Sequence, residues 1–364
     1  MTSTRTPVWT LATPAIAVAV TAAAYGGAGL GAAATVLTGI VAVVLVVTVV
    51  TAVHHAEVVA HRIGEPFGTL VLALAVTVIE VALIVSMMLS ATSGGAVIAR
   101  DAVFAAVMII LNFVVGLCIL AGATRHREQG FVQLGVSAAL AVLSVLAVLT
   151  LVLPNYTTSV AGPNYTSAQL AFVGVVSLIL YGTFLLVQTV RHRDYFLPAE
   201  KVSEESHHAP PPTARAAGIS MALLLVCLVA VVALAKALAP AVESAVSAVG
   251  APQAVVGILI SGLVLAPESL AAYNAARANR LQTSLNLALG SALATIGLTI
   301  PVVAALSITM GLPLSLGIDP KSTVLLALTI VVAVLSLGTG RTTILQGAVH
   351  LVLFAVFLFM TIFP

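Results

Sequence analysis

Long apolar runs separated by short polar stretches fill the sequence between residues 9 and 363. A bilayer core of about 30 Å requires about 20 apolar residues per helix, which sets the length expected of each run. The first run continues into the second without a clear cleavage point, so we interpret it as a helix rather than a signal peptide. The pattern predicts eleven membrane-spanning helices, at Trp9–Leu30, Ala32–Val53, Phe67–Leu89, Ala102–Thr124, Phe131–Leu153, Ala168–Val190, Ala216–Leu238, Ala254–Ala276, Thr283–Leu306, Ser322–Leu337 and Thr342–Phe363.

Composition supports this interpretation. Hydrophobic residues make up 61% of the chain and charged residues 7%, and the mean hydropathy is +1.20. These values lie far outside the range of soluble proteins, so the sequence predicts an all-α integral membrane protein with membrane lipid as its surroundings. A formal net charge of +2, with the basic residues placed between apolar runs, offers no basic face, which excludes nucleic acid as a partner.

The basic residues alternate between the two sides of the predicted membrane. Eleven of the fourteen lie on the side of the N-terminus, and only Arg100, Lys236 and Lys321 lie on the other side. Cytoplasmic loops carry the excess of Lys and Arg. The distribution therefore predicts a plasma membrane protein, in a bacterium the inner membrane, with a cytoplasmic N-terminus and a C-terminus on the opposite side.

One long hydrophilic segment divides the predicted helices into six followed by five. We expect an extra N-terminal helix in residues 1–31, a first five-helix repeat in 32–190, a cytoplasmic linker in 191–215 and a second five-helix repeat in 216–364. Because five is odd, two homologous repeats must have opposite orientations in the membrane, which is an architecture of secondary transporters. The linker is polar and Pro-rich, so we expect a solvated segment, with binding of a cytoplasmic cation by its Glu and His side chains as the alternative.

Two acidic residues occupy positions where acids are costly. Ten of the twelve can be placed in loops or at helix ends, whereas Glu80 and Glu268 lie near the middle of apolar runs. An acid at that depth costs several kcal/mol unless it faces a polar cavity, is protonated or meets a cation. Each lies on the second helix of its predicted repeat. This symmetry indicates a functional pair.

Polar residues on the following helices reach a comparable depth. They are Asn112 in the first repeat, and Ser291 with Thr295 in the second. Pro267 precedes Glu268 and cannot donate a backbone hydrogen bond, so a local chain break there is expected, with carbonyl oxygens free for a cation. No proline occupies the matching position before Glu80.

Paired carboxylates at membrane depth can bind a cation and protons in turn. A hard cation such as Ca²⁺ takes about six to eight oxygen ligands, and two carboxylates balance its charge. When the cation leaves, desolvation and mutual repulsion favour protonation of the carboxylates. Cation and protons then compete for the same oxygens, and alternating exposure of the site would couple their movements. The sequence has no GxxxxGK[ST] phosphate loop that would indicate ATP use.

Three segments, Gly64–Met88, Arg100–Leu117 and Leu265–Val302, resemble the bacterial calcium/proton antiporters of the calcium/cation antiporter superfamily, a branch also described as sodium-potassium/proton antiporters. The resemblance extends from about His54 to Pro364. It implies that Glu80 and Glu268 carry the cation and the protons, with help from polar groups of the next helices.

The chain departs from that family at one motif. Many members have Gly-Asn-x-x-Glu, but here the stretches are Val76-Thr77-Val78-Ile79-Glu80 and Val264-Leu265-Ala266-Pro267-Glu268. Thr77 lies one helical turn before its glutamate and can supply an oxygen, whereas the side chain of Leu265 cannot. The cation ligands are therefore fewer than in those members, while both acids are kept.

Together these features predict a secondary active transporter that exchanges Ca²⁺ for protons at a midplane site, with no permanently bound cofactor. Glu80 and Glu268 are the expected ligands of the cation, supported by Thr77, Asn112, Ser291 and Thr295. A Na⁺(K⁺)/H⁺ antiporter that uses the same site remains an alternative, as does a passive cation channel. An intramembrane metalloprotease is excluded, because the sequence lacks HExxH and neither glutamate has a histidine partner within its own predicted helix.

Overall fold

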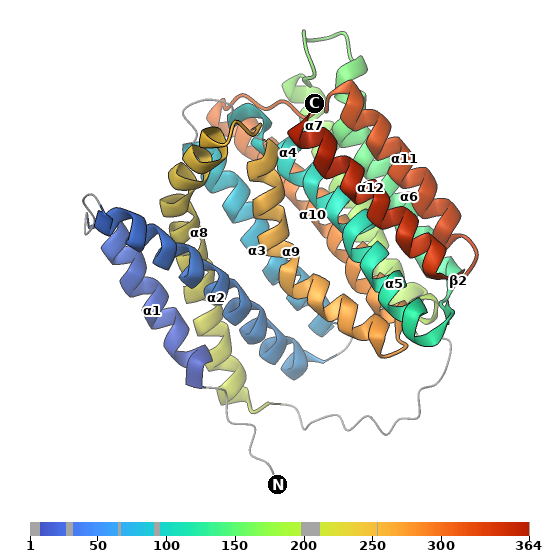
Figure 1. Cartoon of the computed structure of the whole chain (residues 1–364), viewed down its shortest axis with the longest axis horizontal. Coiled ribbons are helices and arrows are strands. Elements are labelled where there is room, and N and C mark those ends of the chain that lie inside the picture. Colours follow the sequence, from blue (N-terminus) through green and yellow to red (C-terminus); the bar gives the residue numbers. More distant parts are fainter. Residues whose placement is uncertain are drawn as a thin grey trace. The chain divides into compact units, whose positions relative to one another are not determined.

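The computed structural model describes residues 8–26, 32–64, 67–90, 95–197, 212–252 and 254–363. Over these residues the chain is nearly all helical (Figure 1). Nine helices are long and apolar enough to cross a membrane, and the described parts of two more, Trp9–Tyr25 and Leu74–Leu89, are shorter apolar helices. All eleven coincide with the predicted runs, so the predicted fold class, an all-α integral membrane protein, is confirmed.

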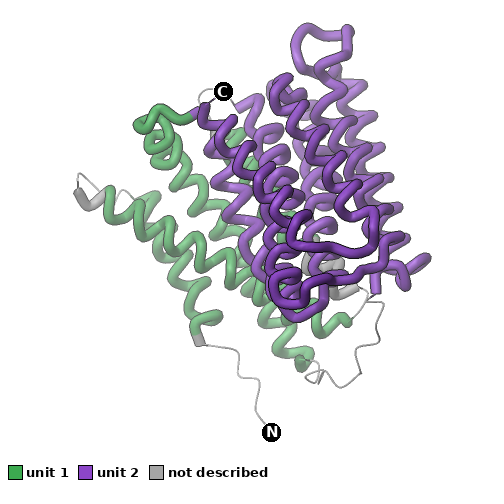
Figure 2. The backbone as a smooth tube through the Cα atoms, turned by 45° about the vertical axis from the view of Figure 1, so that its right-hand side comes forward, with its two compact units in different colours: residues 1–90, 208–251 green, residues 91–207, 252–364 purple. Residues whose placement is uncertain are grey.

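The chain divides into two compact units, coloured separately in Figure 2. Unit 1 comprises Met1–Ser90 and His208–Ala251, and unit 2 comprises Ala91–His207 and Pro252–Pro364. Each unit therefore contains helices from both predicted repeats. The boundaries of the repeats and their inverted orientation stay a prediction. Residues 198–211 of the predicted linker lie outside the described part of the chain. They include the Glu and His side chains for which cation binding is the alternative role.

Unit 1 is built around a pair of long helices, α2 and α8, which contact each other. Its described helices are α1 (Val8–Tyr25), α2 (Ala32–Ile63), α3 (Phe67–Ser90) and α8 (Ala214–Ala248). On each helix of the pair, one row of buried residues follows steps of three and four, which is the repeat that packs two helices along a seam. They are Val41, Leu45, Val49, Ala52, Ala56 and Val59 on α2, and Ser220, Leu224, Cys227, Val231 and Leu234 on α8.

Helix α1 is tied to this pair by polar contacts. The Nε2 atom of buried His55 on α2 lies 3.1 Å from the carbonyl oxygen of Thr10, and the hydroxyl of Tyr25 donates to the carbonyl oxygen of Ala233 on α8 at 3.2 Å. Helix α2 continues to Ile63, ten residues beyond the predicted end of its apolar run. Glu57, predicted in a loop or at a helix end, therefore lies inside the last two turns of α2.

Over its described residues, unit 2 is a bundle of seven spans. The first, Gly95–His126, joins α4 (Gly95–Met108), the π-helical segment η1 (Ile109–Val114) and α5 (Val115–His126). The others are α6 (Gln133–Ala147) with η2 (Val148–Val152) and η3 (Leu153–Tyr156), α7 (Ser167–Leu186) with η4 (Val187–Arg191), α9 (Ala254–Arg277), α10 (Leu281–Met310), α11 (Pro320–Leu337) and α12 (Ile344–Ile362). The short helix η5 (Arg193–Tyr195) follows η4, and β1 (Gln129–Gly130) pairs antiparallel with β2 (Arg341–Thr342).

Glycines allow close helix contacts at two places in unit 2. A Cβ atom on Gly116 of α5 would lie 2.9 Å from the Cβ of His350 on α12, and one on Gly297 of α10 would lie 2.7 Å from the Cβ of Tyr181 on α7. Only glycine fits at such separations. These contacts bring α12 onto α5 and α7 onto α10.

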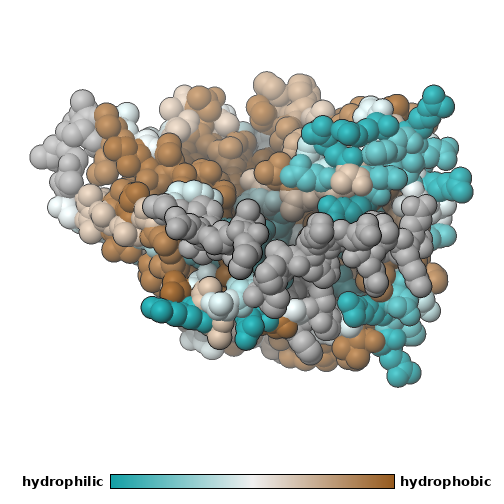
Figure 3. Space-filling view, turned by 90° about the horizontal axis from the view of Figure 1, so that it is seen from below, coloured by the Kyte–Doolittle hydropathy of each residue, from teal (hydrophilic) through white to brown (hydrophobic). Residues whose placement is uncertain are grey.

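Two further acids, predicted in loops or at helix ends, lie within the outer two turns of helices. Asp101 is in the second turn of α4, where its Oδ1 lies 2.7 Å from Nε of Arg100, and Glu243 is in α8, which extends to Ala248. Arg100 and Asp101 therefore form an ion pair on this helix. Hydrophobic side chains cover broad areas of the surface, with hydrophilic groups gathered over part of the face shown in Figure 3, as lipid contact requires.

Candidate functional site

The carboxylate of Glu268 faces a hydroxyl of the next helix. Helices α9 and α10 are joined by a three-residue turn in which Asn279 has a φ of 58°, a conformation that asparagine tolerates. Glu268 and Ser291 lie at nearly equal distances along the chain from this turn, so the hairpin sets them opposite each other. Ser291 Oγ donates a hydrogen bond of 2.5 Å to Oε2 of the half-buried Glu268.

The turn itself is anchored by a buried glutamine from β1. Gln129 Nε2 donates to the carbonyl oxygen of Ala276 at 2.8 Å and to Asn279 Oδ1 at 3.0 Å. The α9–α10 hairpin is thereby fixed at one end of unit 2. This anchoring holds the hydrogen-bonded pair in register, because a shift of either helix would break the contacts at the turn.

Helix α9 runs without interruption through Pro267, so the chain break expected there is not seen. The helix continues because its other backbone bonds outweigh the one that proline removes. Proline lacks an N–H, so it cannot donate to the carbonyl oxygen of Leu263 one turn earlier. The carbonyl oxygen of Leu263 therefore lacks its usual helical donor, and its use as a cation ligand stays a prediction.

Thr295 lies one helical turn beyond Ser291 on α10. A spacing of four residues places both hydroxyls on one face of the helix. Thr295 is 1% exposed, and Ser291 is half-buried. The two hydroxyls predicted for the second repeat therefore lie one turn apart on one face of α10, and Ser291 is the one that contacts Glu268.

Asn112 lies within the π-helical segment η1 and is fully buried. Its Nδ2 donates to Thr329 Oγ1 of α11 at 3.0 Å, and lies 3.8 Å from the sulfur of Met108. Single π-helical turns inside α-helices are frequent at functional sites. Segment η1 contacts both α9 and α10, so Asn112 belongs to the same bundle as Glu268.

In unit 1, Glu80 and Thr77 lie one turn apart on α3. Glu80 is 3% exposed and Thr77 is 4% exposed. Helix α3 packs against α2 and α8. The burial of Glu80 agrees with the apolar setting predicted for it, and its approach to Glu268 of unit 2 stays a prediction.

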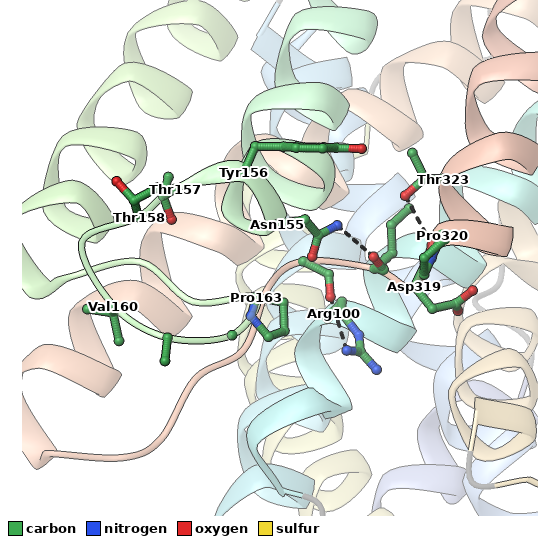
Figure 4. A pocket seen from close by; sticks show the side chains of 14 residues that line it. Arg100, Asn155, Tyr156, Thr157, Thr158, Val160, Pro163, Asp319, Pro320 and Thr323 are labelled. Atoms are coloured by element: carbon green, nitrogen blue, oxygen red, sulfur yellow. Dashed lines mark hydrogen bonds between the residues drawn. The ribbon is translucent and has the colours of Figure 1, made fainter.

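A pocket in unit 2 lies away from these residues. It has a volume of about 820 Å³ and is lined mainly by residues 155–163 and 317–320 together with Arg100 (Figure 4). Arg100 Nη1 donates to the carbonyl oxygen of Gly317 at 3.1 Å, and Asn155 Nδ2 donates to that of Ile318 at 2.7 Å. No predicted site residue lines this pocket within the described part of the chain. Its side chains clamp the segment that leads into α11.

Asp319 ends that segment and caps α11. Desolvation alone would raise the pKa of Asp319, but hydrogen bonds from the hydroxyl and backbone N–H of Ser322, together with the charge of Lys321, hold the pKa below its ordinary value. The carboxylate is thus ionised at neutral pH. Its role is to start the helix that carries Thr329.

Sequence comparison relates the chain to known ion transporters. The profile of the family described as sodium/calcium exchanger protein matches residues 16–190 and 219–363. A Sinorhizobium fredii protein named as an ionic transporter, y4hA, is 54% identical over 313 residues, covering 86% of this chain and 84% of that protein. The sodium-potassium/proton antiporter ChaA of Escherichia coli is 35% identical over 314 residues, covering 85% and 84%.

Structural comparison gives the same fold. The crystal structure of the H⁺/Ca²⁺ exchanger CAX superposes with a TM-score of 0.70 at 14% sequence identity, over 96% of this chain and 87% of that one. At this identity the likeness concerns the fold alone.

Proposed function

Because the chain belongs to the sodium/calcium exchanger protein family, and is therefore a cation exchanger rather than an enzyme, we propose that it exchanges Ca²⁺ for protons across the membrane. Glu80 and Glu268 bind the cation and the protons in turn at a shared midplane site. Alternating exposure of this site to the two sides couples the opposite fluxes.

The observation that carries the proposal is the pair formed by Glu268 and Ser291. Burying a carboxylate within a membrane span costs free energy unless the carboxylate is protonated, accepts a hydrogen bond or binds a cation. Here Ser291 Oγ donates a hydrogen bond of 2.5 Å to Glu268. A hydroxyl can donate to the carboxylate when no cation is bound, and can rotate to offer its oxygen when one arrives. The pair is thus suited to both states of an exchange cycle.

The remaining ligands would come from neighbouring oxygens. Thr77 supports Glu80 on α3, whereas Thr295 and Asn112 offer a hydroxyl and an amide oxygen within unit 2. With the carbonyl oxygen of Leu263 and water, these groups approach the oxygen number that Ca²⁺ prefers. Ca²⁺ and H⁺ are substrates in this scheme, so no permanently bound cofactor is required.

A Na⁺(K⁺)/H⁺ exchange at the same site is the second candidate function. It is favoured by the E. coli relative, which is named for sodium, potassium and protons. The absence of Gly-Asn before both glutamates also points to fewer ligands, which suits a monovalent ion. We do not retain the passive channel, because the family consists of exchangers.

We further propose that the protein lies in the plasma membrane, the inner membrane in a bacterium, with its N-terminus in the cytoplasm. The support is the distribution of basic residues, eleven against three. Cysteine labelling from outside of single-cysteine variants at the two ends of one span tests this orientation.

The exchange itself is tested in proteoliposomes with an imposed pH gradient. Uptake of radioactive Ca²⁺, Na⁺ and K⁺ is measured separately, each with an ionophore that collapses the gradient as control. The proposal expects saturable Ca²⁺ uptake that stops when the gradient is collapsed. Uptake of Na⁺ or K⁺ alone under these conditions would replace it with the second candidate function.

A further inference from the structure

A buried polar contact joins segment η1 to α11 in unit 2. Asn112 Nδ2 donates to Thr329 Oγ1 at 3.0 Å, and Thr329 Oγ1 in turn donates to the sulfur of Met108 at 3.6 Å. Asn112 and Thr329 are fully buried, and Met108 is 1% exposed. The contact connects a helix of the first predicted repeat with one of the second.

This arrangement fixes which way the Asn112 amide points. The hydroxyl proton of Thr329 goes to the sulfur, so the oxygen of Thr329 is an acceptor and attracts the NH₂ group of Asn112. The amide oxygen must then point away from Thr329. Within the described part of the chain, Asn112 Oδ1 is buried and has no hydrogen-bond partner.

A buried amide oxygen without a donor is unusual in folded proteins and calls for an explanation. A bound cation supplies one, because carbonyl oxygens are good ligands for hard cations and cannot repel them as an NH₂ group would. The π-helical form of η1 and its contacts with α9 and α10 place Asn112 among the elements that carry Glu268 and Ser291.

We propose that Thr329 is a positioning residue for the transported cation. By holding the nitrogen of the Asn112 amide, it keeps the amide oxygen turned toward the cation rather than toward α11. This inference rests on the proposed function, since it presumes that Asn112 is a cation ligand. Thr329 itself does not touch the ion.

The test compares two variants of Thr329 in cation uptake driven by a pH gradient. Thr329→Val keeps the shape but removes the hydroxyl, whereas Thr329→Ser keeps the hydroxyl. The matched control is Thr183→Val, because Thr183 is exposed and its hydroxyl bonds only to Ile179 of its own helix at 2.7 Å. Should the valine variant fail to accumulate in the membrane, Thr329→Ala takes its place.

We expect Thr329→Val to raise the KM for the cation roughly 10-fold or more, as loss of a group that orients a metal ligand commonly does, with little change in kcat. Thr329→Ser and Thr183→Val should behave as the unmodified protein. A mere packing role would instead lower the amount of folded protein and kcat together, and leave KM unchanged.

A double-mutant cycle gives a second measurement. Asn112→Ala alone should raise KM, and adding Thr329→Val should raise it no further, because the two residues act through one oxygen. An unchanged KM in Thr329→Val, or additive effects in the double variant, would overturn the inference. The variant Glu268→Gln distinguishes failure of this inference from failure of the proposed function. If Glu268→Gln exchanges cations at the unmodified rate, the proposed site is refuted. If Glu268→Gln is inactive while Thr329→Val is fully active, only the role of Thr329 is refuted.

Discussion

Replacing Glu268 with glutamine should abolish coupled exchange while the protein stays folded. Glutamine keeps nearly the same volume and a carbonyl oxygen, so the 2.5 Å contact with Ser291 can persist as a neutral hydrogen bond. A hydrogen bond to an ionised group is worth about 1.5–3 kcal/mol and a neutral one about 1 kcal/mol. Relief of the buried charge compensates for that loss, so thermal stability without cation should fall little or rise.

The effect on transport should be far larger. A carboxylate oxygen about 2.4 Å from a monovalent cation contributes on the order of 7 kcal/mol at an effective dielectric constant of about 20, and twice that for a divalent cation. If desolvation offsets about two thirds of the monovalent figure, about 2.3 kcal/mol remains, which is a factor of about 50 in affinity. The variant also loses a titrating group, so a cycle that needs both carboxylates cannot close.

The assay is uptake of radioactive Ca²⁺ and Na⁺ into proteoliposomes under a pH gradient. The matched control is Glu128→Gln, because Glu128 is an exposed acid outside the spans whose carboxylate lies 3.6 Å from Arg341. Glu128→Gln should transport normally. Calcium uptake by Glu268→Gln at the rate and pH dependence of the unmodified protein would refute the reasoning, since the exchanging group would then be elsewhere.

Three further predictions concern the scaffold. Gly297→Ala should destabilise the protein by about 1–3 kcal/mol, because its Cβ would lie 2.7 Å from the Cβ of Tyr181. Thermal unfolding in detergent measures this change. The control Gly290→Ala has open space around it on the same helix and should not lower Tm. Asp319→Ala should cost about 1 kcal/mol at neutral pH through loss of the helix cap. Because folding lowers the pKa of Asp319, the stabilisation by its carboxylate is present above the ordinary pKa and is lost as pH falls through the lowered pKa. The difference in Tm between Asp319→Ala and the unmodified protein should therefore shrink below about pH 4. A difference that stays constant with pH would contradict this. Deleting residues 200–212 should preserve basal exchange in vesicles, because this polar segment supplies no intramembrane ligand; complete loss of transport by a folded deletion variant would be the opposite result.

The positions of the helices could be predicted because bilayer thickness fixes the length of an apolar run. The ends of the helices could not be predicted, because helices continue into the polar layer, where residues are no longer selected for hydrophobicity. Helix α2, which continues to Ile63, is an example. The same limit applies to Asp101. Hydropathy places it before the start of an apolar run, and the structure places it in the second turn of α4, paired with Arg100.

The contact of Glu268 with the next helix could be expected from the sequence, because a short turn sets Ser291 opposite it. The contact of Asn112 with Thr329 could not be expected from the sequence. A single threonine in an apolar run usually bonds to its own helix, as Thr183 does. Only the packing of α11 against η1 distinguishes Thr329 from such residues.

The central claim, that one site exchanges calcium for protons, is tested most directly by recording both fluxes in the same vesicles. Proteoliposomes loaded with a pH indicator receive external Ca²⁺, and calcium uptake and proton release are followed together. The account predicts saturable calcium uptake with about two protons released per ion, as two shared carboxylates allow. Calcium uptake that proceeds without any proton release would contradict it.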